Sequence, residues 1–116
     1  MGLSIEQSRK GSTAIIALEG KLNTETAPEL EEVLDAWFEE GTRNALVDGQ
    51  ALNSISSAGL RALLECEQKI RGSDRRVVLA GFNEDLRQVC ELAGFASIFT
   101  LYDTREQALA SLEEPS

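Results

Sequence analysis

The chain has 116 residues, a net charge of −9 and no histidine. Its length fits a single domain over residues 1–116, and its composition, 42% hydrophobic and 27% charged, is ordinary for a globular protein. The acidic balance argues against a nucleic-acid-binding protein. No apolar run approaches the roughly 18 residues of a membrane span, so we expect no membrane insertion.

The cysteines and the N-terminus indicate the compartment. Cys66 and Cys90 stand apart among apolar neighbours, which is typical of small buried hydrophobes in a reducing compartment. With no histidine and no paired-cysteine motif, we expect no metal site. The N-terminus lacks a basic segment followed by an apolar one, so no signal peptide is expected and we predict a cytoplasmic protein.

A hairpin is predicted at the start of the chain. Residues 3–7 alternate between apolar and polar, the period of a strand with one exposed face. Residues 10–12 supply turn residues, and residues 13–18 are nearly continuous apolar, as in a strand covered on both faces. The first strand is therefore expected at the edge of the sheet.

The first helix follows a loop predicted over residues 19–23. Thr24 or Thr26 can cap it, Pro28 fits its first turn, and Gly41 ends it. The apolar residues recur at helical spacing; they are Ala27, Leu30, Val33, Leu34, Trp37 and Phe38. Acidic residues occupy the other side, which we interpret as a solvated face, the alternative being a docking surface for a basic partner.

The central part of the chain predicts a short buried strand, a loop and a second helix. The strand covers residues 44–48, the loop residues 49–55, and the helix runs from about Ala58 to Arg71. The apolar residues of this helix cover too wide an arc of its surface for all of them to lie in the core. We expect residues such as Leu63, Cys66 and Ile70 inside, with Leu60 or Leu64 partly exposed.

The last third continues the alternation of strands and helices. Residues 76–80 predict a buried strand, Asn83 caps a third helix that Gly94 ends, and residues 98–101 predict the last strand. Residues 104–107 form a capping box that opens a short final helix.

The order of elements predicts an α/β fold. We expect a mostly parallel sheet of four to five strands, with an antiparallel N-terminal edge strand and about four helices. Residues 113–116 are expected to fray. Such sheets bind ligands at the carboxyl ends of their strands, where residues 20–23, 49–57 and 81–83 would gather.

Ser56 and Ser57 are placed where a loop becomes the second helix. A hydroxyl there can cap the helix, and a phosphate there would meet free N–H groups and a favourable dipole. A catalytic nucleophile is disfavoured, because Ile55 replaces the first glycine of G-x-S-x-G and no histidine can act as a base. We therefore expect no enzyme, and no cofactor either, since no glycine-rich nucleotide motif occurs.

Residues 48–60 resemble the signature of STAS domains, the fold of bacterial anti-sigma-factor antagonists, which reads approximately D-L-S-x-[VL]-x-x-[IM]-[DS]-[ST]-x-G-L. The positions that match are Asp48, Leu52, Ile55, Ser57, Gly59 and Leu60. Three flanking segments are also similar to the family. Residues 20–23 look like its G-x-L-D, residues 77–81 like its fourth strand and residues 92–95 like its L-x-G-[LF].

The resemblance implies a partner-switching regulator. The residue at the position of Ser57 is phosphorylated by a serine kinase that is also the anti-sigma factor, with Ser56 as the alternative site here. The unmodified domain binds that kinase and releases the sigma factor, and a PP2C-type phosphatase resets it. We expect a monomer or weak homodimer. The implied partner-binding residues are Asn23, Thr24, Ser56, Ser57, Ala58, Gly59, Leu60, Arg61 and Leu64; the structural motif residues are Gly20, Asp48 and Gly59.

Two residues depart from the family pattern. Asn23 and Ser56 each stand where the family often has Asp. Both changes remove negative charge near Ser57, so we expect slower phosphorylation or a different partner. Two alternatives stay open: an accessory subunit of a lipid-transport ABC system, and a module that binds a small ligand such as a nucleotide or lipid.

Overall fold

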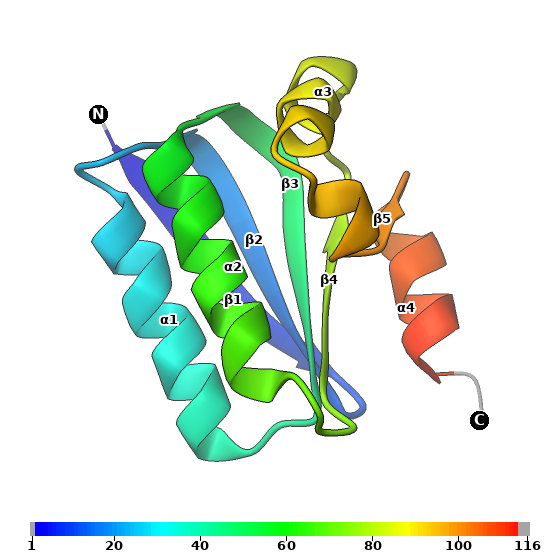
Figure 1. Cartoon of the computed structure of the whole chain (residues 1–116). Helices are drawn as coiled ribbons and strands as arrows, with labels where there is room; N and C mark the ends of the chain where they lie inside the picture. Colours follow the sequence, from blue (N-terminus) through cyan, green and yellow to red (C-terminus); the bar gives the residue numbers. More distant parts are fainter. Residues whose placement is uncertain (1, 114–116) are drawn as a thin grey trace.

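The chain forms one five-stranded sheet with helices on both faces, in a computed structural model that describes residues 2–113 (Figure 1). The elements are β1 (Leu3–Lys10), β2 (Thr13–Leu22), α1 (Ala27–Glu40), β3 (Asn44–Ile55), α2 (Ser57–Ile70), β4 (Arg76–Ala80), α3 (Glu84–Leu92), the 3-10 helix η1 (Phe95–Ser97), β5 (Leu101–Tyr102) and α4 (Arg105–Glu113). Within the described residues, no helix has the length and apolarity that a bilayer crossing requires.

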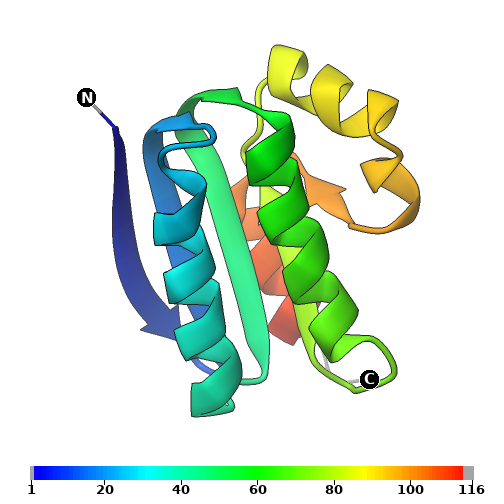
Figure 2. The ribbon, with the colours of Figure 1, turned by 60° about the vertical axis from the view of Figure 1, so that its left-hand side comes forward.

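The strands lie in the order β1-β2-β3-β4-β5. β1 pairs antiparallel with β2, and every other neighbouring pair is parallel. α1 and α2 cover one face of the sheet, α3 lies beside the amino-terminal half of α2, and α4 lies on the opposite face (Figures 1 and 2). The predicted α/β fold, with its antiparallel edge strand and four helices, is confirmed.

Two apolar cores hold these layers together. The larger core lies between the sheet and the layer of α1, α2 and α3, and it includes Leu22, Leu30, Leu63 and Phe95. The smaller core lies beneath α4 and consists of Ile15, Leu46, Val78, Ala80, Ala108 and Leu109. Alternate residues of β2 and β3 thus serve opposite cores, as the period of a strand requires.

The predicted loops at residues 19–23 and 49–55 are wrong in extent. β2 continues to Leu22 and β3 to Ile55, and the two extensions pair with each other in register Gly20↔Leu52 and Leu22↔Ile55. The register shifts twice between Ala17 and Lys21, which allows polar residues of the extension to face outward. Pairing between β2 and β3 therefore extends both strands into segments that were predicted to be loops.

The last strand also differs from the prediction over residues 98–101. Phe95 and Phe99 pack with ring centroids 5.0 Å apart, and the N–H of Phe99 donates to the carbonyl of Phe95 over 2.7 Å. This compact turn keeps the chain helical, so β5 begins only at Leu101. Of the predicted frayed segment, Glu113 still belongs to α4 and the rest falls outside the described residues.

The predictions for α1 and α2 are largely confirmed. Gly41 ends α1 with a φ of 85°, a left-handed conformation that glycine adopts without strain. Along α2 the expected inward residues, Leu63, Cys66 and Ile70, are buried. Leu60 and Leu64 are half-buried at the margin of the larger core.

Candidate functional site

The candidate site is built on the junction between the ends of β2 and β3 and the start of α2. The N–H of Ser56 donates to the carbonyl of Leu22 over 2.9 Å, which ties the entrance of α2 to the end of β2. Ser56 is extended, with ψ at 175°, and Ser57 is the first helical residue. This junction places Ser57 beside the turn that leaves β2. We call residues 23–24 and 56–57 together the serine rim.

The two serines differ in accessibility. Ser57 is exposed, whereas Ser56 is half-buried and its enclosed hydroxyl oxygen has no hydrogen-bond partner among residues 2–113. The side chain of Ser56 makes no capping hydrogen bond to α2, so the prediction of a serine cap is wrong at this position. The first turn of α2 therefore keeps its N–H groups free of side-chain caps, and only Ser57 presents its side chain to solvent.

Gly59 brings the first turn of α2 close to the sheet. A Cβ atom at this position would lie 2.6 Å from Cγ of Leu22 and 3.2 Å from Cγ1 of Ile55. Any larger residue would push the helix away from the strand ends. Close packing therefore requires glycine at this position. The contact holds Ser57 at a fixed height above the sheet.

Asn23 organises the other half of the serine rim. Its side-chain oxygen accepts hydrogen bonds from the N–H groups of Glu25 at 2.9 Å and Thr26 at 3.1 Å. In return the hydroxyl of Thr26 accepts from the N–H of Asn23 at 2.9 Å. Thr24 is exposed at the tip of this turn. Thr26, one of the two predicted caps, occupies the N-cap position of α1, but its side chain makes no capping hydrogen bond and Asn23 holds the turn instead.

Gly20 has a structural role on the same strand. Its φ is 109°, and a Cβ atom there would approach the carbonyl oxygen of Gly2 to 2.4 Å. Glycine is therefore required both for the backbone conformation and for the close approach of the N-terminal segment.

α2 continues from Ser57 with two half-buried leucines and one exposed cation. Leu60 and Leu64 lie one turn apart, pack against the larger core and leave part of each side chain in solvent. Arg61 is exposed, and Ala58 is half-buried between the serines and Leu60. We call Leu60 and Leu64 the leucine strip; it lies on the same helix as Ser57 and starts within its first turn.

Asp48 lies away from the serine rim, on the face covered by α4. Its carboxylate is buried; one oxygen accepts from the N–H of Gln50 at 2.9 Å and the other pairs with Nε of Arg105 at 2.8 Å. This pair fixes α4 to the sheet. Asp48 is thus a structural residue with no contact to the phosphorylation site predicted for this chain.

The three loops predicted to share one edge do not all meet. β4 ends at Ala80, which pairs with Asp48, whereas β3 continues seven residues further to Ile55. Gly81 therefore lies at the level of Gln50, below the serine rim. Of the three strand ends, those of β2 and β3 border the site and that of β4 does not.

Metal-ligand clusters and the two thiols were the other candidates for a reactive site. They contain no group of three or more histidine, cysteine, aspartate or glutamate side chains arranged to hold a metal ion. Burial raises the pKa of Cys66 and of Cys90 to about 11, so both thiols are protonated at neutral pH and poor nucleophiles.

One exposed apolar residue was missed by the sequence analysis. Leu92, at the end of α3, is 91% exposed. Leu86 and Cys90 turn into the core, and a residue two positions after Cys90 on a helix points to the other side. The helical phase that places Leu92 outside can be read from the sequence, and Val89 and Ala93 are exposed as well.

Comparisons with known proteins agree with this geometry. The family model of the STAS domain matches residues 4–108. The Bordetella bronchiseptica protein BtrV, named as an anti-sigma factor antagonist, is 36% identical over 99 residues, which cover 85% of each chain. The resemblance predicted from residues 48–60 is confirmed.

Solved structures share the fold. An anti-sigma factor antagonist from Mycobacterium paratuberculosis has a TM-score of 0.90 at 21% identity, covering 97% of this chain and 95% of its own. SpoIIAA of Bacillus has TM-scores of 0.77 in its unphosphorylated form and 0.75 in its phosphorylated form, at 17% and 16% identity. The alignments cover 97% and 95% of this chain, and 100% of SpoIIAA in each case.

Proposed function

The chain belongs to the STAS domain family and is of the anti-sigma-factor-antagonist type, and from this we propose that phosphorylation of Ser57 controls its binding to a serine-kinase anti-sigma factor. With Ser57 unmodified the protein holds the kinase and the sigma factor is free. With Ser57 phosphorylated the complex dissociates. The observation that carries this proposal is the exposed hydroxyl of Ser57 at the first position of α2, beside the leucine strip.

Ser57 is a better substrate than Ser56 on steric grounds. A kinase must bring the hydroxyl oxygen in line with the transferred phosphoryl group, and the oxygen of Ser56 is enclosed within the protein. Modification of Ser56 would require the entrance of α2 to open, which means breaking the Ser56–Leu22 hydrogen bond. Ser57 needs no such opening.

The electrostatic effect of a phosphate on partner binding follows from the position of Ser57 at the start of α2. A phosphate adds roughly −1.5 to −2 charges. Free N–H groups and the positive end of the α2 dipole accommodate that charge within this protein. A partner surface that covers a neutral hydroxyl would instead have to desolvate a dianion, which opposes binding. The switch therefore needs no refolding, and SpoIIAA supports this, because both of its forms align with this chain almost equally well.

The leucine strip is the proposed apolar part of the partner-binding surface. Replacing Leu64 by Asp would place a charge among apolar partner contacts, and we expect roughly a tenfold or larger loss of affinity for the kinase. Leu92→Asp serves as a comparison, because it introduces the same charge on α3 at a fully accessible position. Retained binding of Leu64→Asp, with the fold intact by circular dichroism, would remove the strip from the proposed interface.

The direct test is intact-mass spectrometry after incubation with the cognate serine kinase and ATP. We expect a single added phosphate, localised by fragmentation to Ser57, which a PP2C-type phosphatase removes. The Ser57→Ala variant should gain none, whereas Ser56→Ala should be modified normally. Phosphate on Ser56 in the wild-type protein would contradict the assignment.

A further inference from the structure

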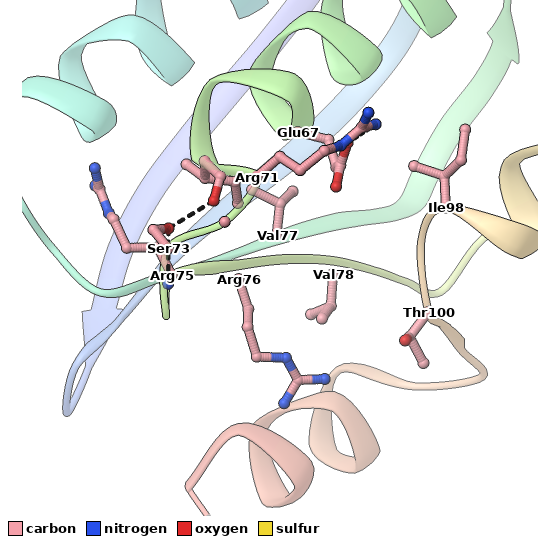
Figure 3. Close-up of a pocket in the computed structure, with 11 residues that line it drawn as sticks. Glu67, Arg71, Ser73, Arg75, Arg76, Val77, Val78, Ile98 and Thr100 are labelled. Atoms are coloured by element: carbon pink, nitrogen blue, oxygen red, sulfur yellow. Dashed lines mark hydrogen bonds and ion pairs between the residues drawn. The ribbon is translucent and has the colours of Figure 1, made fainter.

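A second feature lies at the opposite end of α2 from the serine rim, on the edge of β4. The two sites are separated by the fourteen residues of α2, or about 20 Å along the helix axis. β4 has five residues, but β5 pairs only with Leu79 and Ala80. In the described part of the chain, the first part of β4 therefore has no neighbouring strand on that side. Figure 3 shows this free edge, with α2 on one side of it and α4 on the other.

The backbone of β4 leaves one donor and one acceptor on this edge. The N–H of Arg76 donates to Arg43 on the β3 side, whereas the N–H of Leu79 donates to Thr100 on the β5 side. Since neighbouring residues of a strand point their backbone groups to opposite sides, Val77 points its N–H and C=O groups toward the free edge. Within residues 2–113 neither group has a backbone partner.

A hollow of about 220 Å³ lies against this edge. We call it the β4 groove; its principal lining residues are Arg71, Arg76, Val77, Ile98 and Thr100. Ile70 and Val77 give it an apolar floor, and Ile98 is 37% exposed at its end. The groove thus combines unpaired backbone groups with an accessible apolar surface.

The β4 groove has a net positive charge, because Arg71, Arg75 and Arg76 line it together with one acidic residue, Glu67, although the chain carries −9 overall. Figure 3 shows Arg71 on the α2 side of β4 and Arg76 on the α4 side. Arg71 pairs with Glu67 over 2.9 Å, and Arg76 is exposed with no ion pair inside the described part of the chain. Arg75 also lines the groove, but its guanidinium is engaged with carbonyls at the end of α1.

We propose that the β4 groove binds an extended acidic segment of a partner protein, which adds a short strand to the free edge of β4. Backbone pairing with Val77 supplies the contact that strand addition uses. Successive side chains of an added strand point to opposite faces, so two consecutive carboxylates would reach Arg71 on one face and Arg76 on the other. An apolar residue beside them would cover Ile98.

A simple anion does not fit the groove as well. It could contact Arg71 and Arg76, but the carbonyl of Val77 would stay without a donor and would repel it. A peptide strand brings an N–H group to that carbonyl and a carbonyl to the N–H of Val77. The proposed occupant is therefore a peptide with adjacent acidic residues, and binding there leaves the serine rim accessible.

The test uses a capped peptide, acetyl-Ser-Val-Glu-Glu-Val-Ser-amide, titrated into the full-length ¹⁵N-labelled protein. We expect amide shifts that centre on residues 76–78 and 100, and slower hydrogen exchange of the Val77 amide. Arg76→Gln should weaken binding roughly three- to tenfold, as for one partly exposed charge-assisted contact. The matched control is Arg61→Gln, which removes the same charge at the other end of α2 and should leave the affinity unchanged.

Two further reagents separate strand addition from anion binding. The same peptide with N-methyl groups on both glutamates should lose binding, because it cannot donate those N–H groups. Inorganic phosphate should neither protect the Val77 amide nor compete with the peptide at equal ionic strength. Shifts centred on the serine rim, equal loss in both arginine variants, full binding of the methylated peptide, or competition by phosphate would each overturn the proposal.

Discussion

The two ends of the α1–α2 layer differ in the charged groups that lie beside the helix termini. At the amino end of α2 the exposed group is the neutral hydroxyl of Ser57, and the first-turn N–H groups have no side-chain cap. At the carboxyl end, Arg75 already supplies permanent positive charge to backbone carbonyls of α1. The dipole of a helix favours an anion at one end and a cation at the other. The carboxyl end of α1 therefore has a favourable charge beside it in the folded protein, whereas the first turn of α2 contains no acidic residue.

The largest expected effect is a loss of partner affinity, caused by a negative charge placed at the amino end of α2. Ser57→Asp should weaken binding to the kinase by about 100-fold, roughly 3 kcal/mol, because the partner would have to desolvate a carboxylate. Ser57→Ala should bind at least as well as the wild type and resist inactivation by ATP. Isothermal titration calorimetry with the kinase measures both.

The control for that prediction is Ser8→Asp, which adds the same charge at an exposed position of β1. It should bind like the wild type. If Ser57→Asp and Ser57→Ala bound with equal affinity, charge at the amino end of α2 would not control the complex.

At the carboxyl end of α1, removing the charge of Arg75 should lower the free energy of unfolding and should not change partner binding. The guanidinium of Arg75 donates to carbonyls of Phe38, Trp37 and Thr42 over 2.9–3.1 Å and lies 4.3 Å from the ring of Trp37. Arg75→Ala should lower the free energy of unfolding by about 2–3 kcal/mol. Arg75→Lys should recover only part of this, because an ammonium cannot contact three acceptors in one plane.

Urea denaturation checks the Arg75 prediction, with Arg76→Ala as the matched control. Arg76 is the next residue along the chain, but it is exposed and unpaired within residues 2–113. Its replacement should change stability by no more than about 0.5 kcal/mol. Equal costs for the two arginines would mean that the carboxyl end is not held by Arg75.

A smaller loss of stability is expected from Gly59→Ala at the amino end. Alanine gains about 1 kcal/mol in helix propensity. Its Cβ would, however, lie 2.6 Å from the fully buried Leu22, and overpacking of this kind costs about 1–3 kcal/mol. We expect a net loss of about 1–2 kcal/mol in urea denaturation, given that the overlap is with a branched side chain in the core.

A double-mutant cycle identifies the cause of that loss. Leu22→Ala removes the atoms that the new methyl group meets, so the two substitutions together should cost at least about 1 kcal/mol less than their sum. Ser57→Ala, at the exposed first position of the same helix, should be close to neutral. Additive effects of Gly59→Ala and Leu22→Ala would show that Gly59 is not required by packing.

The fold was largely predictable because most of its signals are local. The helical spacing of Leu30, Leu34 and Trp37 and the left-handed stop at Gly41 define α1 without reference to other elements. The ends of β2 and β3 were not predictable in this way. Residues 49–55 mix polar and apolar residues without strand alternation and form a strand by pairing with residues 19–22, and pairing between distant segments leaves no local pattern.

The site also combines features that follow from the local sequence with features that depend on contacts between distant segments. The exposure of Ser57 and the partial burial of Leu60 and Leu64 follow from helix phase. The enclosure of the Ser56 hydroxyl and the close packing of Gly59 against Leu22 and Ile55 are contacts between distant segments, which a sequence does not display. Similarly, the free edge of β4 exists because the Phe95–Phe99 contact delays the start of β5.

The smallest expected effect concerns the charge of the serine rim itself. Asn23→Asp should leave stability unchanged within about 0.5 kcal/mol, because a carboxylate oxygen can accept from the N–H groups of Glu25 and Thr26 as the amide oxygen does. It restores the acidic residue that the family often has at this position. A carboxylate there can help to orient the Ser57 hydroxyl for transfer, and we expect phosphorylation by the cognate kinase to become roughly two- to fivefold faster.

Radiolabelled phosphate transfer measures that rate, and Thr24→Asp is its matched control. Thr24 is the exposed neighbour of Asn23, so this variant adds the same charge without replacing the oxygen that holds the turn. It should phosphorylate at the wild-type rate if the position of the carboxylate matters, and as fast as Asn23→Asp if only net charge does. A slower reaction of Asn23→Asp would indicate that repulsion of ATP outweighs orientation of the hydroxyl, and that the kinase is adapted to the uncharged rim of this chain.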